Sequence, residues 1–308
     1  MLKVAMMGSG GVGGFYGAML ARAGCDVTFI ARSAHLAAIQ SQGLRIRNDL
    51  REDVVLKPVR ATDDPASCGP VDVMIVSVKL WDTAAAAVQM KPLVGRETAV
   101  LSLQNGVTKD DVLKQAFGDR AVMGGVAYIG SHIEAPGVIR QVGTMQRIVL
   151  GEYDGHVSER ARRLHEALLR AGVNAELSTD VRRALWEKYV FLVGLSGATA
   201  SMRKPLGPIR NNPQTRAFML ELMRETVAVG RAHGVALPPD FAEERQAWGD
   251  SLPADMSSSM HHDLEQGNRL EVEWLAGGVV QLGRAVGVAT PMNRAVWDIL
   301  CLHAEGRR

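Results

Sequence analysis

The hydrophobic pattern of the chain changes at about residue 180. Before that point, short apolar runs alternate with segments of helical periodicity, which is the sequence form of a parallel sheet with covering helices. The nearly continuous apolar run over 71–78 is typical of a parallel strand that is buried on both faces. Strands are expected at 3–7, 27–31, 71–78, 98–103, 121–129, 137–141 and 147–151, and helices at 12–23, 34–42 and 158–171.

After residue 180 the strand pattern disappears and only helical periodicity remains. Prolines and Gly-Val pairs separate the helical segments, as is usual where helices end. Helices are expected at 180–202, 214–233, 257–286 and 292–304. The pattern therefore predicts an α/β domain over residues 1–178 and an all-α domain over residues 179–308.

Composition and charge are those of an ordinary globular protein. The formal net charge of +2 gives no reason to expect nucleic acid or a membrane surface as a partner. Cys25, Cys68 and Cys301 are far apart and have no metal-ligand spacing, which favours a reducing compartment. No apolar run reaches the length of a membrane span, and the first residues lack the pattern of a signal peptide. A cytoplasmic location is expected.

The segment GSGGVG, residues 8–13, follows the first expected strand and opens the first helix, so it fits G-x-G-x-x-G in its proper context. The three spaced glycines permit a tight turn, close approach of the backbone to a pyrophosphate and close packing of helix on strand. The alternative is a glycine-rich turn without function. We interpret the segment as the phosphate-binding loop of a Rossmann-type, doubly wound sheet. Cofactor contacts are expected from Gly8, Ser9, Gly10, Gly11, Val12 and Gly13.

Arg32 stands at the end of the second expected strand, where a site specific for NAD usually places a carboxylate. A guanidinium at this point suits the 2′-phosphate of NADP(H), because it binds a phosphate through two parallel hydrogen bonds. We therefore expect NADP(H) as the cofactor. The alternative is a surface arginine at the start of a helix.

Polar residues follow two further strands of the expected sheet, at the edge where open α/β sheets bind their ligands. Lys79 follows one strand and Asn105 follows the next. Both side chains are expected to reach the nicotinamide side of a cofactor or an anionic substrate. An Asn-Gly pair is also ordinary turn chemistry, so a structural role for Asn105 stays open.

The segment WEKYVFLVGLSGATASM, residues 186–202, is apolar nearly all round after Lys188, which predicts a helix buried on every side. Lys188 falls on one helical stripe with leucines and a valine, so a core-facing lysine is expected there. A lysine that loses water needs a carboxylate partner or a lowered pKa, and this makes Lys188 a candidate proton donor. The alternative is a lysine that extends past the apolar face to reach water.

Glu271 lies seven residues after Leu264 and four before Leu275, on the apolar stripe of the helix expected at 257–286. A carboxylate in such a row is seldom left without a partner, and Lys188 is the candidate. A plain structural ion pair would give the same pattern. The sequence His261-His262-Asp263 does not predict a metal site, because adjacent histidines project to different sides of a helix and no second ligand pair follows.

Together these segments resemble the ketopantoate reductase family (2-dehydropantoate 2-reductases) along essentially the whole chain. No segment is specific alone, but their order and spacing are. The resemblance rests on the GSGGVG loop, Arg32, Ser77-Val78-Lys79, Leu103-Gln104-Asn105-Gly106, Trp186-Glu187-Lys188, and the segment from Ser258-Ser259-Met260 through Asp263 to Glu271.

The resemblance implies a Rossmann domain joined to a helical domain, with a 2-oxo acid bound in the cleft between them and reduced by NADPH to a 2-hydroxy acid, ketopantoate to pantoate first of all. It assigns Lys188 the role of general acid toward the developing alkoxide. It implies that Glu271 holds substrate and lysine, and that Ser259 contacts the substrate carboxylate. Lys79 and Asn105 match residues near the nicotinamide end, and Lys79 is expected to contact the substrate as well.

Four positions depart from the asparagines of the family and hold Leu192, Ser196, Leu206 and Met256. Ser196 is still expected to contact the substrate. Because a pocket that loses its hydrogen-bonding partners loses discrimination for a hydroxylated substrate, a bulkier or less polar 2-oxo acid is an open alternative.

Two other functions also stay open. A dehydrogenase of the 3-hydroxyacid or opine type joins a Rossmann domain to helices in a similar way. A non-catalytic sensor of NADP(H) would need the nucleotide loop but no buried lysine facing a carboxylate. The apolar helices after residue 180 either bury entirely within the chain or leave a face for a second subunit, and a homodimer is weakly favoured.

Overall fold

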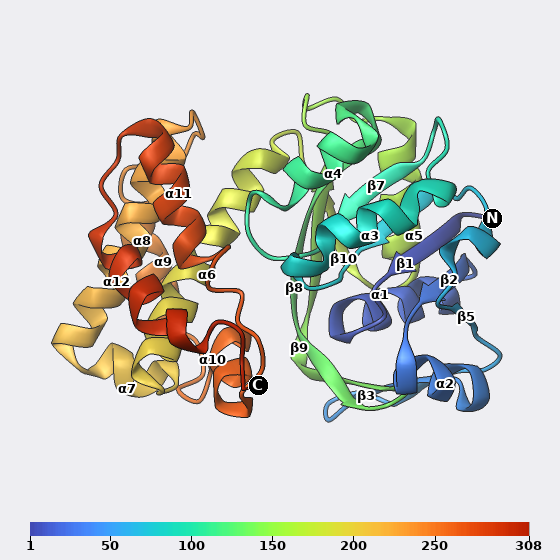
Figure 1. The fold of residues 1–308 in the computed structure, drawn as a ribbon, viewed down its shortest axis with the longest axis horizontal. Coiled ribbons are helices and arrows are strands. Elements are labelled where there is room, and N and C mark those ends of the chain that lie inside the picture. The colour runs from blue at the N-terminus through green and yellow to red at the C-terminus, as the bar shows by residue number, and fades with distance from the viewer. Residues whose placement is uncertain (308) are drawn as a thin grey trace. The chain divides into compact units, whose positions relative to one another are not determined.

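A computed structural model describes residues 1–307, which form two compact units. The first unit comprises Met1–Asn105 and Lys109–Ala184, and the second comprises Gly106–Thr108 and the chain from Leu185 onward. The division falls inside the longest helix, α6 (Val181–Met202). Figure 1 shows the strands of the first unit and the helices of the second.

The first unit is built on one ten-stranded sheet in the order β4-β3-β9-β8-β7-β6-β1-β2-β5, with β10 paired to β9. Six strands, from β5 through β2, β1, β6 and β7 to β8, are mutually parallel. Counted along the chain, their spatial order is three-two-one-four-five-six, which is the Rossmann order. The strands are β1 (Lys3–Met7), β2 (Asp26–Ile30), β3 (Leu44–Asn48), β4 (Val54–Leu56), β5 (Arg60–Thr62), β6 (Val73–Val76), β7 (Ala99–Ser102), β8 (Val122–Ala135), β9 (Val138–Gly151) and β10 (Asn174–Leu177).

Helices cover both faces of this sheet, because successive strand residues point to opposite sides. Val4 and Met6 of β1 pack in the apolar cluster that includes side chains of α1, α2 and α5, whereas Ala5 and Met7 pack in the cluster that includes side chains of α3 and α4. The predicted doubly wound α/β fold is confirmed. The helices of this unit are α1 (Gly11–Arg22), α2 (Ser33–Gln42), α3 (Thr83–Met90), α4 (Lys109–Phe117) and α5 (Glu159–Arg170).

The sheet is mixed, which the sequence pattern did not predict. The expected strands 137–141 and 147–151 are one strand, β9, which pairs antiparallel with β8 over most of its length. The pairing is irregular at Ile129 and Gly130, whose partners on β9 are Gln146 and Val142. The extra residues of β9 between these partners interrupt its apolar pattern, so the sequence predicted two strands in place of one. The strands β3, β4, β5 and β10 were also missed, because each is only three to five residues long and has exposed or half-buried positions.

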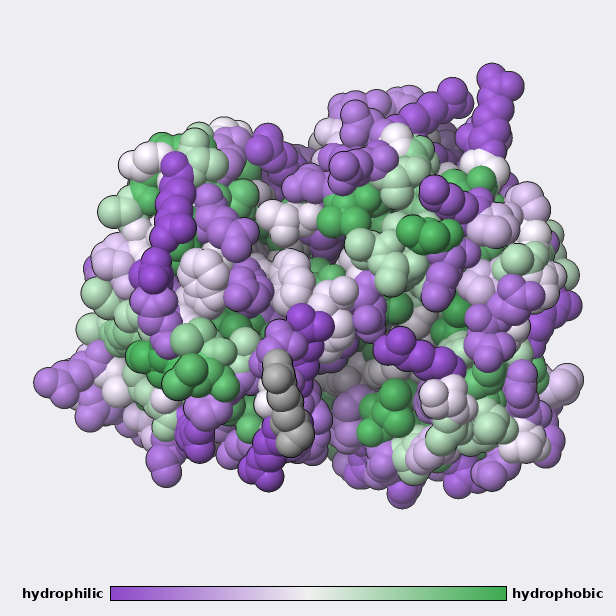
Figure 2. Space-filling model, in the orientation of Figure 1, coloured by the Kyte–Doolittle hydropathy of each residue, from purple (hydrophilic) through white to green (hydrophobic). Residues whose placement is uncertain are grey.

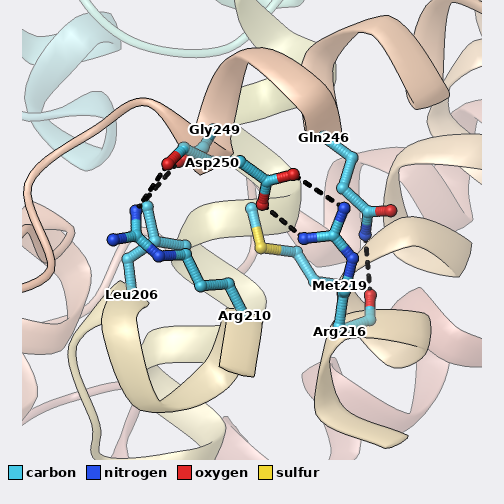
Figure 3. Close-up of a pocket in the computed structure, with 7 residues that line it drawn as sticks. All are labelled: Leu206, Arg210, Arg216, Met219, Gln246, Gly249 and Asp250. Carbon is cyan, nitrogen blue, oxygen red and sulfur yellow. Dashed lines mark hydrogen bonds and ion pairs between the residues drawn. The ribbon is translucent and has the colours of Figure 1, made fainter. Parts of the chain in front are cut away.

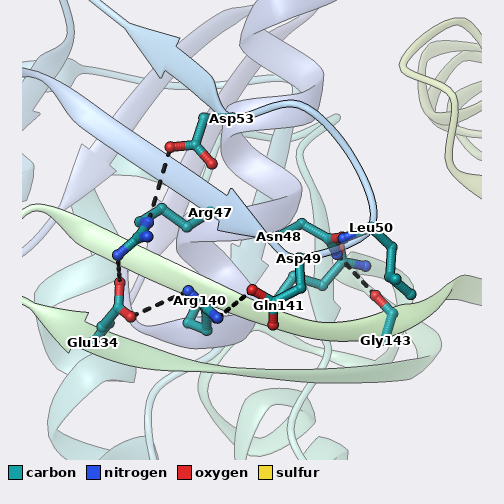
Figure 4. A network of polar contacts seen from close by, with 9 residues as sticks. All are labelled: Arg47, Asn48, Asp49, Leu50, Asp53, Glu134, Arg140, Gln141 and Gly143. Atoms are coloured by element: carbon teal, nitrogen blue, oxygen red, sulfur yellow. Dashed lines mark hydrogen bonds and ion pairs between the residues drawn. The ribbon is translucent and has the colours of Figure 1, made fainter.

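Ion pairs connect β3 to the antiparallel pair β8–β9 (Figure 4). Arg47 lies 3.1 Å from Glu134, which also receives Arg140 at 3.3 Å, and Arg140 pairs with Asp49. Arg47 also approaches Asp53 at 3.9 Å. Each charge in this network has an opposite charge as its neighbour, and the network joins three strands, so its role is structural.

The second unit is all-helical, as predicted. After α6 it contains α7 (Leu206–Asn211), α8 (Pro213–Ala232), α9 (Phe241–Asp250), α10 (Ser259–Gln266), α11 (Ala276–Val286) and α12 (Pro291–Leu300). Residues Tyr189–Ala200 of α6 are buried apart from Leu192, which is half-buried, so the expectation of a helix surrounded by protein is confirmed. Helices α7 and α9 were not predicted.

The single helix expected over 257–286 is wrong. Helix α10 ends at Gly267, whose left-handed backbone (φ +71°) places its N–H on the carbonyls of Asp263 and Leu264. Residues 268–275 are not helical, and α11 begins only at Ala276. The spacing between Leu264, Glu271 and Leu275 is therefore not the spacing of one helix face.

The outer face is mainly polar. Hydrophilic side chains and smaller apolar groups alternate over the face drawn in Figure 2. Among residues 1–307, no helix combines the length and the apolar character that crossing a bilayer requires.

A fully buried lysine holds the end of β7 against β8. The Lys109 ammonium donates to the carbonyl oxygens of Ser102 (2.6 Å) and Gly125 (3.1 Å) and lies 3.3 Å from the Asp110 carboxylate. The Tyr153 hydroxyl also donates to the Asp110 carboxylate, at 2.6 Å. Burial lowers the pKa of Lys109, and the Asp110 carboxylate opposes that shift. The ammonium has three protons and three acceptors, so the buried charge is fully partnered.

Removing this charge tests its structural role. Lys109→Met leaves Asp110 buried without its cation, and we expect the free energy of unfolding to fall by about 3–5 kcal/mol, measured by urea denaturation followed by circular dichroism. Lys91→Met, at an exposed lysine of the same unit, is the control and should cost less than about 0.5 kcal/mol. A Lys109→Met protein as stable as the control would contradict this role.

Candidate functional site

The candidate site of the first unit lies where the strand order reverses, between β1 and β6. Gly8 follows β1 and Ser77 follows β6, and the two backbones touch here. A Cβ on Gly8 would lie 2.8 Å from the Val78 nitrogen and 2.9 Å from the Ser77 carbonyl carbon, and the φ of Gly8 is +94°. Open α/β sheets bind their ligands at such a switch point, outside the carboxyl ends of the strands.

The glycine-rich loop has the geometry of a phosphate-binding turn. A Cβ on Gly13 would lie 2.0 Å from the Gly8 carbonyl oxygen, so α1 packs against the loop at a distance that only glycine allows. Gly10 is different, because a Cβ there would meet only Ile133 at 3.9 Å. Gly10 precedes α1, and no side chain caps its N-terminus. The first turn of α1 therefore offers its N–H groups beside an open backbone, which suits an anion.

His35 forms a hydrogen bond with the backbone of the glycine-rich loop, a contact that was not predicted from the sequence. Its Nδ1 accepts from the Gly137 N–H at 3.1 Å, so its proton resides on Nε2, which donates to the Ser9 carbonyl at 2.8 Å. The Ser9 side chain is buried and donates to the Ile30 carbonyl at 3.0 Å. The hydroxyl of Ser9 thus shapes the loop, and its backbone remains the part suited to a cofactor.

Arg32 lies at the end of β2, as expected, and its side chain is 82% exposed. Its Nη2 donates to Asp82 Oδ2 at 3.1 Å, and Asp82 belongs to the turn after β6. An ion pair this exposed is weak, so the guanidinium can exchange or share this partner when an anion binds.

Lys79 and Asn105 follow β6 and β7 at the same sheet edge, as predicted from the strand ends. Lys79 is exposed, and its ammonium lies 5.6 Å from the centre of the Trp81 ring. Asn105 is half-buried. Between these positions in space lies Gln104, whose amide donates to the Val78 carbonyl at 2.9 Å. The structure thus connects the two turns through a residue that the sequence analysis did not select.

In the second unit, Lys188 is half-buried on α6 between the buried residues Trp186 and Tyr189. Lys188 was expected to face the core, and the structure places it at the edge of the core. Tyr189 reaches the backbone that follows Glu271, since its hydroxyl lies 2.9 Å from the Trp274 carbonyl and 2.7 Å from that of Leu275. Burial raises the pKa of Tyr189, so it stays a neutral donor.

Glu271 is 6% exposed and lies in the non-helical segment before α11. Its backbone carbonyl accepts from the N–H groups of Trp274 and Leu275, which forms the turn that Tyr189 anchors. Glu271 is buried, as expected from the sequence, but that expectation assumed a helix over 257–286, and Glu271 does not lie in a helix. Tyr189 fixes this turn to the part of α6 that carries Lys188.

The serine segment opens α10. Ser258 is the N-cap, and its Oγ accepts from the His261 N–H at 3.0 Å and contacts Thr199 Oγ1 at 2.8 Å. Ser259, the predicted substrate contact, is the first residue of the helix and is exposed. The cap thus joins α10 to α6 and leaves Ser259 accessible.

The four positions that depart from the family pattern belong to the apolar core of the second unit or border on it. The Leu206 N–H donates to the Met256 carbonyl at 2.8 Å, and Leu206 is buried in the core cluster against which Leu192 and Met256 pack. Ser196 is fully buried, and within residues 1–307 its Oγ has no hydrogen-bond partner. The contact of Ser196 with a substrate stays a prediction.

A small pocket in the second unit, drawn in Figure 3, is structural. Arg210 donates to the carbonyls of Asp250 (3.1 Å) and Leu252 (2.6 Å) at the end of α9, and Arg216 pairs with the Asp250 carboxylate at 2.7 Å. These contacts already occupy the charged groups and join α7, α8 and α9. The pocket is lined by Leu206, Arg210, Arg216, Met219, Gln246, Gly249 and Asp250. In the part of the chain that the structure describes, no three metal-ligating side chains gather in one place.

The roles of His35, Gln104 and Tyr189 depend on contacts between residues far apart in the chain. Gln104 was within the segment Gln104-Asn105-Gly106, but only its neighbour Asn105 was predicted to contact the cofactor. Nothing in the local pattern around His35 or Tyr189 indicates which backbone groups they bind.

Comparison with known proteins agrees with this arrangement. The family model described as "Ketopantoate reductase PanE/ApbA" matches residues 4–155, and that of its C-terminal domain matches residues 180–304. A 2-dehydropantoate 2-reductase of Mesorhizobium japonicum is 33% identical over 96% of this chain and 95% of its own. The crystal structure of a PanE/ApbA family ketopantoate reductase from Ralstonia eutropha JMP134 has a TM-score of 0.89 at 36% identity, covering 98% of both chains.

D-mandelate dehydrogenase, solved with NADH and anilino(oxo)acetate, shares the fold with a TM-score of 0.90 over 98% of both chains, at 19% identity. The two family models together span most of the residues of both units. The chain belongs to the ketopantoate reductase PanE/ApbA family of oxidoreductases.

Proposed function

We propose that this protein reduces a 2-oxo acid to a 2-hydroxy acid with NADPH as the reductant. The observation that carries the proposal is the topological switch point between β1 and β6, where Gly8 meets Val78, Gly10 is open and Arg32 is exposed at the end of β2. Membership of an oxidoreductase family supports it. A switch point of this kind suits a dinucleotide, with its pyrophosphate at the N-terminus of α1.

The choice of NADPH over NADH rests on Arg32 and on the absence of a carboxylate at its position. When bound, the reduced nicotinamide supplies the hydride. Arg32 would hold the 2′-phosphate, and the first turn of α1 would hold the pyrophosphate. Lys79 and Asn105, at the ends of β6 and β7, would bind at the nicotinamide end.

Lys188 is proposed to donate a proton to the oxygen of the substrate ketone as it gains negative charge. Its half-buried position on α6 is suited to this role, because the ammonium is partly desolvated and still has a route to water for reprotonation. Glu271, buried on the turn that Tyr189 anchors, would orient the substrate and the lysine, and the exposed Ser259 would bind the substrate carboxylate.

The substrate is either ketopantoate or a less polar 2-oxo acid. The names of the relatives favour ketopantoate. The apolar side chains of Leu192, Leu206 and Met256, at positions where the family pattern has asparagines, favour a substrate with fewer hydroxyl groups. The anilino(oxo)acetate complex of D-mandelate dehydrogenase suggests that aryl-substituted oxo acids belong in the test.

The proposal is tested by the oxidation of NADPH, followed at 340 nm, with ketopantoate, phenylglyoxylate and branched aliphatic 2-oxo acids. We expect turnover of at least one, with the higher kcat/KM for the less polar acids if the apolar positions line the pocket. Turnover of none of them by protein that binds NADPH would contradict the reductase proposal and favour a sensor of NADP(H). Turnover only when an amine is added would favour the opine type.

Replacing Arg32 tests the choice of cofactor. We expect Arg32→Ala to weaken NADPH binding about 10- to 100-fold, because charge-assisted hydrogen bonds contribute about 1.5–3 kcal/mol, and to leave NADH binding within about twofold. Fluorescence titration measures both affinities. Arg96→Ala, at another exposed arginine of the first unit, is the control and should change neither. An unchanged ratio of the two affinities in Arg32→Ala would refute the NADP(H) assignment.

Replacing Lys188 tests the proton donor. We expect Lys188→Ala to lower kcat by about 100- to 10,000-fold, the usual contribution of general acid catalysis, with the Kd for NADPH nearly unchanged. Lys204→Ala, at an exposed lysine beyond the end of α6, should keep full activity. Retained turnover in Lys188→Ala would assign the proton to another group.

A further inference from the structure

We infer that Gln104 is a positioning residue that connects the turn after β6 to the turn after β7, and thereby fixes Lys79 and Asn105 at the nicotinamide end of the cofactor. The inference rests on the proposed function, which supplies the cofactor. It adds a residue that does not touch the reacting atoms and that acts through the two neighbours it holds.

The Gln104 side chain is buried, and both the amino group and the oxygen of its amide form hydrogen bonds. Its Nε2 donates to the Val78 carbonyl at 2.9 Å and to Thr83 Oγ1 at 2.8 Å, while its Oε1 accepts from Ser102 Oγ at 2.9 Å. Because a carbonyl oxygen is only an acceptor, the amino group must face Val78, and this fixes the orientation of the amide. Ser102 Oγ also accepts from the Gln104 backbone N–H at 3.2 Å, which closes a small ring at the end of β7.

These contacts lie on both sides of Lys79. Val78 precedes it, and Thr83, the first residue of α3, ends the turn that carries it. The Thr83 hydroxyl donates in turn to the Leu80 carbonyl at 2.7 Å, so the turn is closed on itself and bound to Gln104 at its start and its end. Asn105 follows Gln104 directly in the chain. One amide therefore sets the separation of the two polar residues proposed for the nicotinamide end.

Only a glutamine amide satisfies this arrangement. Val78 and Thr83 require two donated protons and Ser102 requires an acceptor, a combination that glutamate and leucine of similar length do not offer. The buried Lys109 holds the same strand end from the other side, through the Ser102 carbonyl. The turn after β7 is thus fixed to β8 by Lys109 and to the turn after β6 by Gln104.

The test compares two ligands that share the adenosine end and differ in the nicotinamide. NADPH reaches Lys79 and Asn105, whereas 2′-phospho-ADP-ribose reaches only the glycine-rich loop and Arg32. We expect Gln104→Leu to raise the Kd for NADPH about tenfold, through the loss of the amide hydrogen bonds, and to change the Kd for 2′-phospho-ADP-ribose by less than about twofold. Titration calorimetry measures both.

Thr83 provides variants that keep the shape of the turn. Thr83→Val removes the hydroxyl and should raise the Kd for NADPH about threefold, whereas Thr83→Ser keeps the hydroxyl and should bind like the unaltered protein. The double variant Gln104→Leu, Thr83→Val should bind NADPH no more weakly than Gln104→Leu alone, because both changes break one linkage. Thr83→Val carries the test if Gln104→Leu does not fold.

The outcomes separate the inference from the proposed function. Equal losses for the two ligands, or unchanged binding of both with a lower Tm, would show that Gln104 is merely structural and would overturn the inference. Failure of the unaltered protein to bind either ligand would overturn the proposed function, and the inference with it. A loss confined to NADPH, shared by Thr83→Val and absent from Thr83→Ser, would support the inference.

Discussion

The structure depends on the close contact between two backbone segments, the one that follows β1 and the one that follows β6. Gly8 leaves β1 in a left-handed conformation against Ser77 and Val78, and Gly13 lets α1 approach the Gly8 carbonyl. Any side chain at either glycine would meet backbone atoms within 3 Å. This constraint places the N-terminus of α1, the end of β2 and the end of β6 at one edge of the sheet. The proposed cofactor site is therefore a consequence of backbone packing, and side chains such as Arg32 only select among dinucleotides.

Hydrogen bonds over long sequence separations then fix the loops around that edge. His35 connects the glycine-rich loop to Gly137 at the turn between β8 and β9, Gln104 connects the turns after β6 and β7, and Lys109 holds β7 to β8. In the second unit Tyr189 does the same for the turn that carries Glu271. Each of these groups is at least partly buried and hydrogen-bonded to backbone groups, and Gln104 and Lys109 also bind side chains, so specific contacts hold each loop in place.

The sequence was sufficient to predict the buried parallel strands β1, β2, β6 and β7, the glycine-rich loop and the helical character of the second unit, because these depend on apolar periodicity and on local turn chemistry. It was not sufficient for β9, since an irregularity in the pairing with β8 interrupts its pattern, nor for the end of α10, since Gly267 ends that helix through its backbone conformation. Glu271 was found to be buried although the helical spacing behind its prediction was wrong. His35, Gln104 and Tyr189 escaped prediction because most of their partners, which are backbone groups and the Thr83 hydroxyl, are distant in the chain and come near only in the folded protein.

The central claim is that this chain binds a reduced nicotinamide dinucleotide and a 2-oxo acid together for direct hydride transfer. The most direct measurement uses NADPH that carries deuterium on C4 of the nicotinamide, with mass spectrometry of the hydroxy acid formed from the preferred oxo acid. Transfer of one deuterium to C2 of the product is the predicted result. A product without deuterium from cofactor labelled at both C4 positions, or the absence of any hydroxy acid, would contradict the claim.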